Sequence, residues 1–484
     1  MIYLRKSFLR AAASEKLSGQ ITVWMALCFM VFLSLYLVCL QSVWKQFQKE
    51  QAEQAAEAGL FSLFSEFESH IFNQYDLFCL DTSFGSTGER EDELCSHLWQ
   101  FTEYNLTDAS GAPLYDLELL GVDIKNLVRL TDASGAVFYR QAVKVMKEKT
   151  GVSLAEDWVF PELFQKDAEE NTRRFQEDCE TYEGSIRDYN EEDEEDGEGK
   201  RLDPEASQWD GLWNEFVFEK AIPDGGQVSD RSVMLESAPS HRELSVGMGA
   251  ADGTEDQMIQ KQWFISYLCA YMEQAQKMLP VERKTGWLDY QLEYVIGGKE
   301  TDRENLSAVV GRILLIREGM NYVFLLSCPE LRQKAETLAL LLAGITGNEG
   351  IIKGMEQLIL LGWAYGESLV EVRQLLGGYE LSPVKVVEDW QVSLSGLLPA
   401  LKDPGRYDVQ TRPQEGIDYE ACLRLFLTME SAETLSMRAL DIMEGELGCQ
   451  NGCEDLHLDH CVDYLTAQLW IGEFSLERSY GYEY

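Results

Sequence analysis

The stretch Ile21–Leu40 (ITVWMALCFMVFLSLYLVCL) carries no charged side chain. At about 1.5 Å per residue, a helix of this length spans roughly 30 Å, the thickness of the hydrocarbon core of a bilayer. A secretory signal usually has a shorter apolar region followed by a small-x-small cleavage site, whereas Leu37–Gln41 is bulky throughout. The stretch therefore predicts a single uncleaved transmembrane helix over residues 21–44.

The charges on either side of this helix predict its orientation. Residues 1–20 hold four basic side chains and a single acid, and acids follow soon after the helix, at Glu50, Glu53 and Glu57. Because basic residues favour the cytoplasmic side, we expect a cytoplasmic N-terminal segment and an extracytoplasmic remainder. The predicted location is the cell membrane, with one pass through it.

An amphipathic stalk helix is expected to follow over residues 45–80. No proline interrupts residues 41–72, and apolar or small residues recur every three or four positions, as at Ala52, Ala55, Ala56, Leu60, Leu63 and Phe64. This pattern predicts that the membrane helix continues into the stalk as one long helix. The alternative is a membrane span followed by a separate core helix.

The overall charge limits the partners that the protein can have. The chain of 484 residues has a formal net charge of −42, and its apolar content is 45%. Such an acidic surface repels nucleic acid and anionic headgroups, so we expect no nucleic-acid partner. The apolar content is high enough for a folded protein rather than a disordered one.

We expect a predominantly helical α+β fold, in which the long N-terminal helix leads to a mixed α/β lobe and a helical C-terminal domain. The lobe is assigned to residues 81–164, an acidic variable linker or insert to 165–260, and the helical domain to 261–484. The linker contains Asp188–Gly199 (DYNEEDEEDGEG), which is typical of a solvated loop. An EF-hand is excluded because Asp193 occupies the position that requires glycine.

Helical spacing in the C-terminal part predicts long amphipathic helices over residues 263–278, 332–347, 351–378 and 419–447. The hexapeptide TDASGA occurs twice, at residues 107–112 and 131–136. Aspartate initiates turns and glycine adopts the left-handed conformation, so each copy predicts a turn. The sequences around the two copies differ, which argues against a repeat architecture.

One cluster has the composition of a metal site: Cys449, Cys453, His457, His460 and Cys461. Zinc takes four Cys or His ligands, but this spacing matches no established zinc motif and lacks a distant second pair. A disulfide between Cys449 and Cys453 and the absence of any function are the alternatives. We predict that the cluster binds no metal, and that most of the nine scattered cysteines beyond the membrane helix are free and buried.

The sequence gives no sign of catalysis. It contains no G-x-S-x-G, no H-E-x-x-H, no Walker loop and no G-x-G-x-x-G after a strand. We therefore predict no catalytic residue, no cofactor and no enzymatic activity.

Several stretches resemble known pilus-associated proteins. Gly19–Leu27 (GQITVWMAL) is similar to the start of TadE/TadG-like pseudopilins of the tight-adherence (Flp) pilus. Other stretches resemble an uncharacterised clostridial family of membrane-anchored proteins associated with such pili. They are Tyr290–Lys299, Asp302, Asn305-Leu306, Arg317, Asn321, Trp363–Ser368, Leu375–Gly378 and Lys385 with Trp390. The resemblance covers residues 15–85 and 260–465.

The resemblance implies a non-enzymatic, minor pseudopilin-like subunit of a pilus or related secretion apparatus, with pilus or secretion-system proteins as partners. One feature departs from it. Pilin processing cuts after a glycine and typically requires Glu at the fifth mature position, where this chain has Trp24 if cleavage follows Gly19. An envelope receptor or adhesin unrelated to pili is the main alternative, and a metal-dependent extracytoplasmic enzyme is a further one.

Overall fold

The computed structural model describes residues 2–86, 88, 90–150, 166, 168–180, 215–247, 258–278, 286–382, 385–407, 416–450 and 452–482; the side chains of 2–20, 150, 215–217, 277–278 and 346 are not described. The chain forms two compact units, and each is assembled from segments that are not consecutive in the sequence. Unit 1 comprises Met1–Phe67, Glu89–Leu127 and Tyr464–Glu483, and unit 2 comprises Glu68–Gly88 and Val128–Asp463. The acidic stretch Asp188–Gly199 lies outside the described residues.

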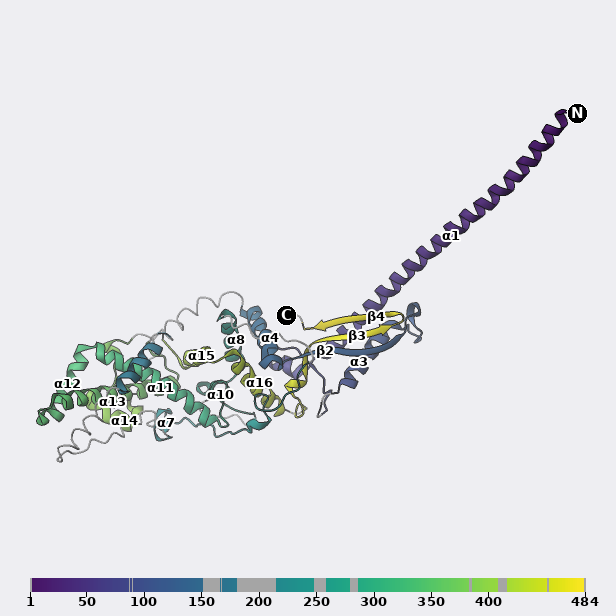
Figure 1. The fold of residues 1–484 in the computed structure, drawn as a ribbon. Coiled ribbons are helices and arrows are strands. Elements are labelled where there is room, and N and C mark those ends of the chain that lie inside the picture. The colour runs from purple at the N-terminus through teal and green to yellow at the C-terminus, as the bar shows by residue number, and fades with distance from the viewer. Residues whose placement is uncertain are drawn as a thin grey trace, which may run out of the picture. The chain divides into compact units, whose positions relative to one another are not determined.

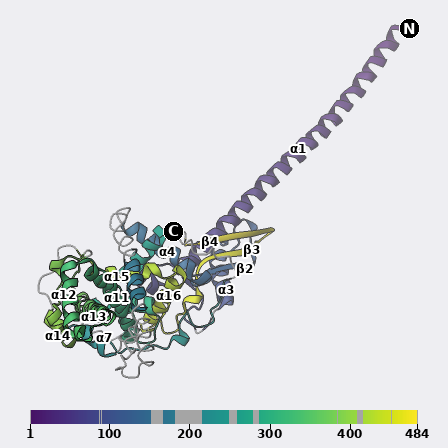
Figure 2. The ribbon, with the colours of Figure 1, turned by 60° about the vertical axis from the view of Figure 1, so that its left-hand side comes forward.

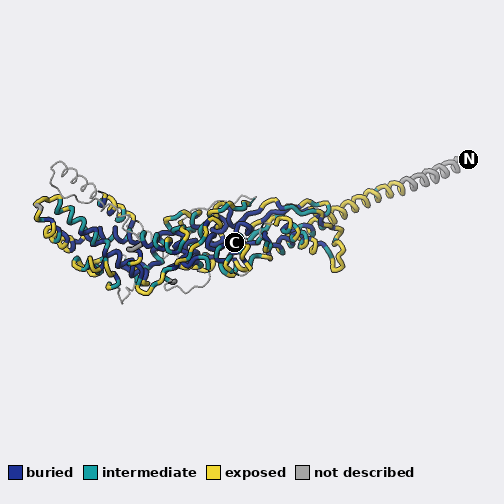
Figure 3. Tube along the Cα trace, turned by 90° about the horizontal axis from the view of Figure 1, so that it is seen from below, coloured by how far each residue is buried: buried dark blue, intermediate teal, exposed yellow. Residues whose placement is uncertain are grey.

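Helix α1 runs without interruption from Ile2 to Phe64 (Figure 1). Its apolar part is exposed (Figure 3) and is long and apolar enough to cross a membrane. Further along, α1 buries one face, which includes Ala56, Leu60 and Phe64. The prediction of one continuous helix is confirmed, but the helix ends at Phe64 rather than at residue 80, and α2 (Ser69–Tyr75) is separate.

In unit 1 the buried face of α1 packs on α3 (Glu91–Leu106) and on β4 (Phe474–Gly481). The backbones of α1 and α3 approach closely where Gly59 faces Thr102. A Cβ atom at Gly59 would lie 2.3 Å from the Thr102 Oγ1 atom and 3.2 Å from its Cα atom. The glycine is therefore required by the contact between the two helices.

We predict that Gly59→Ala destabilises the full-length protein in detergent. The added methyl group would gain about 1 kcal/mol of helix propensity, but overpacking against α3 costs about 1–3 kcal/mol. A urea titration followed by circular dichroism should show a lower midpoint. Gln54→Ala, at an exposed position of the same helix, is the control and should leave the midpoint unchanged. An unchanged or raised midpoint for Gly59→Ala would contradict the packing argument.

The sheet has β3 (Cys461–Ile471) between β2 (Leu119–Arg129) on one side and both β1 (Leu80–Asp81) and β4 on the other. β3 and β4 form an antiparallel hairpin, in which Ile471 is opposite Phe474 and Tyr464 is opposite Gly481. Gly472 forms the turn with a positive φ of 56°. The division between the two units falls within β2 and β3.

The helical domain predicted over residues 261–484 differs from the structure at its C-terminal end. Residues 464–483 belong to unit 1, and the hairpin occupies most of them. Leu465, Ala467, Leu469 and Ile471 are buried at every second position. This two-residue period is the signature of a half-buried strand, and it lies in the range that was predicted to be helical.

Unit 2 is built mainly of helices, and Figure 2 shows α11, α12, α13 and α14 gathered together. A large hydrophobic core includes residues of α4, α8, α10, α11, α13, α15 and α16, and a second core joins α11, α12 and α13. The longer helices are α4 (Asp132–Thr150), α8 (Met258–Tyr271), α11 (Asp302–Ser327), α12 (Pro329–Ala343), α13 (Glu349–Leu376), α15 (Tyr419–Met429) and α16 (Ala432–Gly448). The shorter ones are α7 (Glu215–Ala221), α9 (Ala275–Met278), α10 (Gln291–Gly297) and α14 (Leu397–Lys402).

The single helix predicted over residues 419–447 is two helices in the structure. The side chain of Ser431 accepts a hydrogen bond from the Thr434 N–H and so starts α16. Lys261 donates to the carbonyl oxygens of Thr428 and Glu430, which satisfies the end of α15. Both helices keep the same apolar spacing, so periodicity alone does not reveal the break.

The two TDASGA copies form turns, as predicted, and the second lies at the start of α4, where Ala133, Ser134 and Gly135 depart from the helical conformation. Gly111 and Gly135 have φ angles of 81° and 79°, in the left-handed region. In the second copy Ala133 and Ser134 are left-handed as well. The Asp132 carboxylate accepts hydrogen bonds from the N–H groups of Arg129 and Gly247.

Candidate functional site

A cluster of four buried charged side chains lies at the contact between α11 and α13. We call it the ion-pair centre and define it by Arg317, Asn321, Glu367, Ser368, Glu371 and Lys385. Arg317 and Asn321 are four residues apart on α11, and so are Glu367 and Glu371 on α13, so each pair shares one face of its helix. Its four charged side chains are at most 8% exposed.

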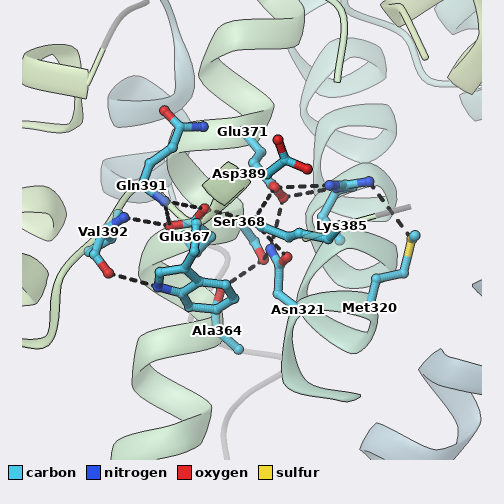
Figure 4. Close-up of polar contacts among 12 residues, drawn as sticks. Met320, Asn321, Ala364, Glu367, Ser368, Glu371, Lys385, Asp389, Gln391 and Val392 are labelled. Atoms are coloured by element: carbon cyan, nitrogen blue, oxygen red, sulfur yellow. Dashed lines mark hydrogen bonds and ion pairs between the residues drawn. The ribbon is translucent and has the colours of Figure 1, made fainter. Parts of the chain in front are cut away.

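Two cations and two carboxylates alternate in this centre. Arg317 donates from Nε and Nη2 to the two oxygens of Glu371, both at 2.9 Å. Lys385 donates to Glu371 at 2.5 Å, to Glu367 at 2.6 Å and to the Asn321 Oδ1 atom at 3.1 Å. Figure 4 shows the side chains of Lys385, Glu371, Glu367 and Asn321 turned toward one another. All three N–H donors of the lysine are therefore used.

The second carboxylate fixes the loop that follows Lys385. Glu367 accepts hydrogen bonds from the backbone N–H of Gln391 at 3.0 Å and of Val392 at 2.7 Å. The Val392 carbonyl oxygen in turn accepts from the indole N–H groups of Trp363 and Trp390. The Lys385 ammonium also lies 4.6 Å from the centre of the Trp390 ring, a cation–π distance.

The pKa values show how the charges compensate. Burial alone would raise the pKa of Glu371, but Arg317 and Lys385 overcome it and lower the pKa to about 2. For Glu367 burial outweighs the attraction of Lys385, and the pKa is raised. Glu371 is thus held as the carboxylate, and this arrangement stabilises a helix pair and a loop rather than presenting a free base.

A cleft of about 350 Å³ opens beside the centre. Its walls carry more acids than bases, and they include the Arg317 guanidinium and the Lys385 ammonium. The lining residues are Arg317, Glu371, Gln374, Tyr379, Glu380, Leu381, Ser382, Lys385, Glu388, Asp389 and Gln391. Charged and amide groups in a cleft of this size could hold a small polar molecule.

The residues of the predicted Cys–His cluster do not form one set. Cys449 is exposed at the end of α16, and Cys453 is buried. Cys461 lies on β3 and contacts the thiol of Cys79. No disulfide joins any of the eleven cysteines, so the Cys449–Cys453 alternative is not realised, and seven of the nine beyond the apolar part of α1 are buried.

The His457 imidazole lies beside a carboxylate, and the Cys461 thiol donates to the His457 carbonyl oxygen at 3.8 Å. Glu444, His457 and Asp459 have potential ligand atoms within 4.8 Å of one another. Arg242, however, donates to Glu444 and, at 2.5 Å, to Asp459. Its hydrogen bonds and those of His457 lower the pKa of Glu444 against the effect of burial. A cation of the protein already neutralises both carboxylates, so a metal would have to displace it.

We predict that this region binds no structural zinc. A structural zinc contributes on the order of 10 kcal/mol to folding, so chelation would unfold a protein that depended on it. Full-length protein in detergent should contain substoichiometric zinc and melt at the same temperature with and without EDTA. One zinc per chain, lost on Cys453→Ser or His457→Ala, would be the contrary result.

The stretches that carry the family resemblance contain members of the ion-pair centre, but the sequence does not place them together. Arg317, Asn321, Glu367, Ser368 and Lys385 all lie in the stretches that carry the family resemblance. Their four-residue spacing on two helices was a usable signal, but pairing α11 with α13 required the fold. Arg242, Glu444 and Asp459 were missed because acids are too common in this chain to stand out.

Comparisons with known proteins give a family and no function. No curated protein and no solved structure matches the chain. A family of unknown function, DUF5702, matches residues 194–473, which contain the ion-pair centre and its cleft. Since the match covers more than half of the chain, the protein belongs to the DUF5702 family of unknown function.

Proposed function

We propose that the protein is a non-enzymatic, single-pass membrane-anchored subunit, minor and pseudopilin-like, of a tight-adherence pilus or a related secretion apparatus. The observation that carries this proposal is α1, whose apolar part is exposed and whose second part packs on α3 and β4. Pilin-like subunits are built in this way. We call the part of the chain after α1, residues 65–484, the head. The same helix can then anchor the subunit in the membrane and align it with neighbours.

The distribution of charge supports an extracytoplasmic head. Basic residues precede the apolar part of α1, and the rest of the chain is strongly acidic. Protease added to wall-stripped cells should therefore digest the head and leave a short membrane-protected fragment. Full protection in intact protoplasts, with digestion after lysis, would refute this orientation.

Assembly itself is tested by genetic complementation. Deletion of the gene should reduce surface pili, and the wild-type chain should restore them. Leu35→Arg should not, because a cation near the bilayer centre costs about 2.5–3.5 kcal/mol on insertion scales. Leu35→Phe is the matched control and should restore pili. Unchanged pilus number after deletion would refute a role in assembly.

The cleft favours one alternative, an envelope receptor or adhesin unrelated to pili. A receptor would bind a small polar ligand saturably, and substitution of the exposed lining residue Glu388 would weaken that binding without changing pilus number. A metal-dependent enzyme has less support, because Arg242 already neutralises the carboxylates beside His457.

A further inference from the structure

Three aromatic rings meet just beyond the apolar part of α1. The ring centres of Trp44 and Phe47 are 5.7 Å apart, and the ring of Tyr115 meets Phe47 edge-on at 5.0 Å. Gln48 reinforces the contact by donating to the Tyr115 carbonyl oxygen at 2.8 Å. Trp44 and Tyr115 remain 48% and 39% exposed, so the cluster has an outer surface.

The backbone is strained at Tyr115, the residue that supplies the third ring of the cluster. Tyr115 and the following Asp116 have φ angles of 62° and 59°. Left-handed conformations cost a non-glycine residue about 1–3 kcal/mol and persist only where the surroundings enforce them. Here the preceding turn is fixed, because the Asp108 carboxylate accepts from the N–H groups of Ser110 and Ala112.

The position of the cluster along α1 coincides with the edge of a membrane. Trp44 lies four residues beyond Leu40, or about 6 Å along a helix, and Phe47 about 10 Å. If Ile21–Leu40 fills the hydrocarbon core, both rings fall in the headgroup region, where Trp and Tyr are enriched in membrane proteins. Tyr115, which contacts Phe47, is then at the same depth.

We propose that Trp44, Phe47 and the Tyr115 loop (residues 107–116) form a docking platform that rests on the lipid headgroups of the outer face of the membrane. The inference rests on the membrane anchoring within the proposed function and adds a second contact, made by the head itself. Such a contact would hold unit 1 upright on the anchor and limit tilting of α1.

The charges around the platform favour a zwitterionic surface. Lys45, the cation nearest to the rings along α1, is paired with Glu473 in the turn between β3 and β4 at 2.8 Å. Asp108, Asp116 and Glu118 lie on or beside the loop and would repel anionic lipid. The platform should therefore act through its aromatic rings, and its lipid contact should not depend on salt.

Photo-crosslinking of the full-length protein in phosphatidylcholine nanodiscs tests the proposal. The photoreactive residue p-benzoylphenylalanine replaces, one at a time, Leu33 within the bilayer, Trp44, Tyr115, and Tyr104 on α3 as a control. Tyr104 is 80% exposed and lies two residues from Thr102, which faces Gly59, about 28 Å beyond Leu40 along α1. Lipid adducts are measured by mass spectrometry.

We expect lipid adducts from Leu33, Trp44 and Tyr115, in similar yield at low and high salt, and none above background from Tyr104. Adducts at Leu33 and Trp44 but not at Tyr115 would overturn the platform and leave the anchor intact. No adduct at Leu33 would overturn the anchor and the platform together. Crosslinks from Tyr115 to a second copy of the chain, in place of lipid, would show that this surface is a protein interface and would also overturn the proposal.

Discussion

Replacing Glu371 with alanine should lower the free energy of unfolding of the full-length protein by about 3–5 kcal/mol, the usual cost of removing one partner from a buried ion pair. Glu371 accepts two hydrogen bonds from Arg317, one from Lys385 and one from the side-chain amide of Asn321. Without it, two buried cations would share only Glu367. Repulsion and lost hydration would then act at the contact between α11 and α13.

A urea titration in detergent, followed by tryptophan fluorescence, measures this loss. Glu371→Gln keeps the volume and removes only the charge, so it should account for most of the effect. Glu388→Ala is the control, since that carboxylate lines the same cleft but is exposed, and surface changes usually stay within about 0.5 kcal/mol. Equal midpoints for Glu371→Ala and Glu388→Ala would show that the ion-pair centre contributes little to stability.

The Glu371 carboxylate also makes the free energy of unfolding depend on pH in the acid range. Its pKa is lowered from 4.5 to about 2 in the folded protein. The stability that the ionised Glu371 contributes to the folded protein is therefore complete above pH 4.5 and is lost as the pH falls toward 2. In Glu371→Gln this part of the acid dependence should be absent.

In unit 1 the sequence predicted the N-terminal helix α1 but not the C-terminal β3–β4 hairpin. Helix α1 was readable because a charge-free run and a three-and-four spacing both extend over many turns. The β3–β4 hairpin was not, because its apolar residues alternate over only a few positions at the end of a helical region. Ser431 shows the remaining limit: a break between helices depends on a cap that looks like any exposed serine in the sequence.

The ion-pair centre could be predicted only in part. Helical spacing indicates that Glu367 and Glu371 share a face, as Arg317 and Asn321 do. It does not indicate which of the many acids of this chain lie beside which bases, since that depends on how α11 crosses α13. The place of Lys385 in the centre is even harder to predict from the sequence, because this residue lies in a loop whose position is fixed by Glu367 and the Val392 carbonyl oxygen.

The second large effect concerns Glu318, next to Arg317 in sequence but outside the ion-pair centre. The side chain is buried, and its Oε1 atom has no hydrogen-bond partner. Burial raises the pKa of Glu318 from 4.5 to about 8. Tyr365 is close enough that this carboxylate adds to the effect of burial in raising the pKa of its phenol. Glu318 is therefore mostly protonated at pH 7 in the folded protein.

We expect Glu318→Gln to stabilise the protein at alkaline pH. In the folded state Glu318 keeps its proton to a higher pH than in the unfolded state. The free energy of unfolding is therefore unaffected by Glu318 ionisation below pH 4.5 and falls as the pH rises to about 8. At 1.36 kcal/mol per pKa unit, the loss is up to about 5 kcal/mol. Glutamine has the same size, cannot ionise and avoids this loss.

Urea midpoints of the wild type and of Glu318→Gln, measured from pH 5 to pH 9, provide the test. The two proteins should be similar at pH 5, and the variant should become progressively more stable as the pH rises. Glu293 and Asp463 also have raised pKa values, about 7 and about 6, but both are present in each protein and cancel in the difference. Glu336→Gln, an exposed change on α12, should follow the wild type. A difference between the wild type and Glu318→Gln that does not change with pH would mean that Glu318 titrates in the folded protein as it does in the unfolded chain.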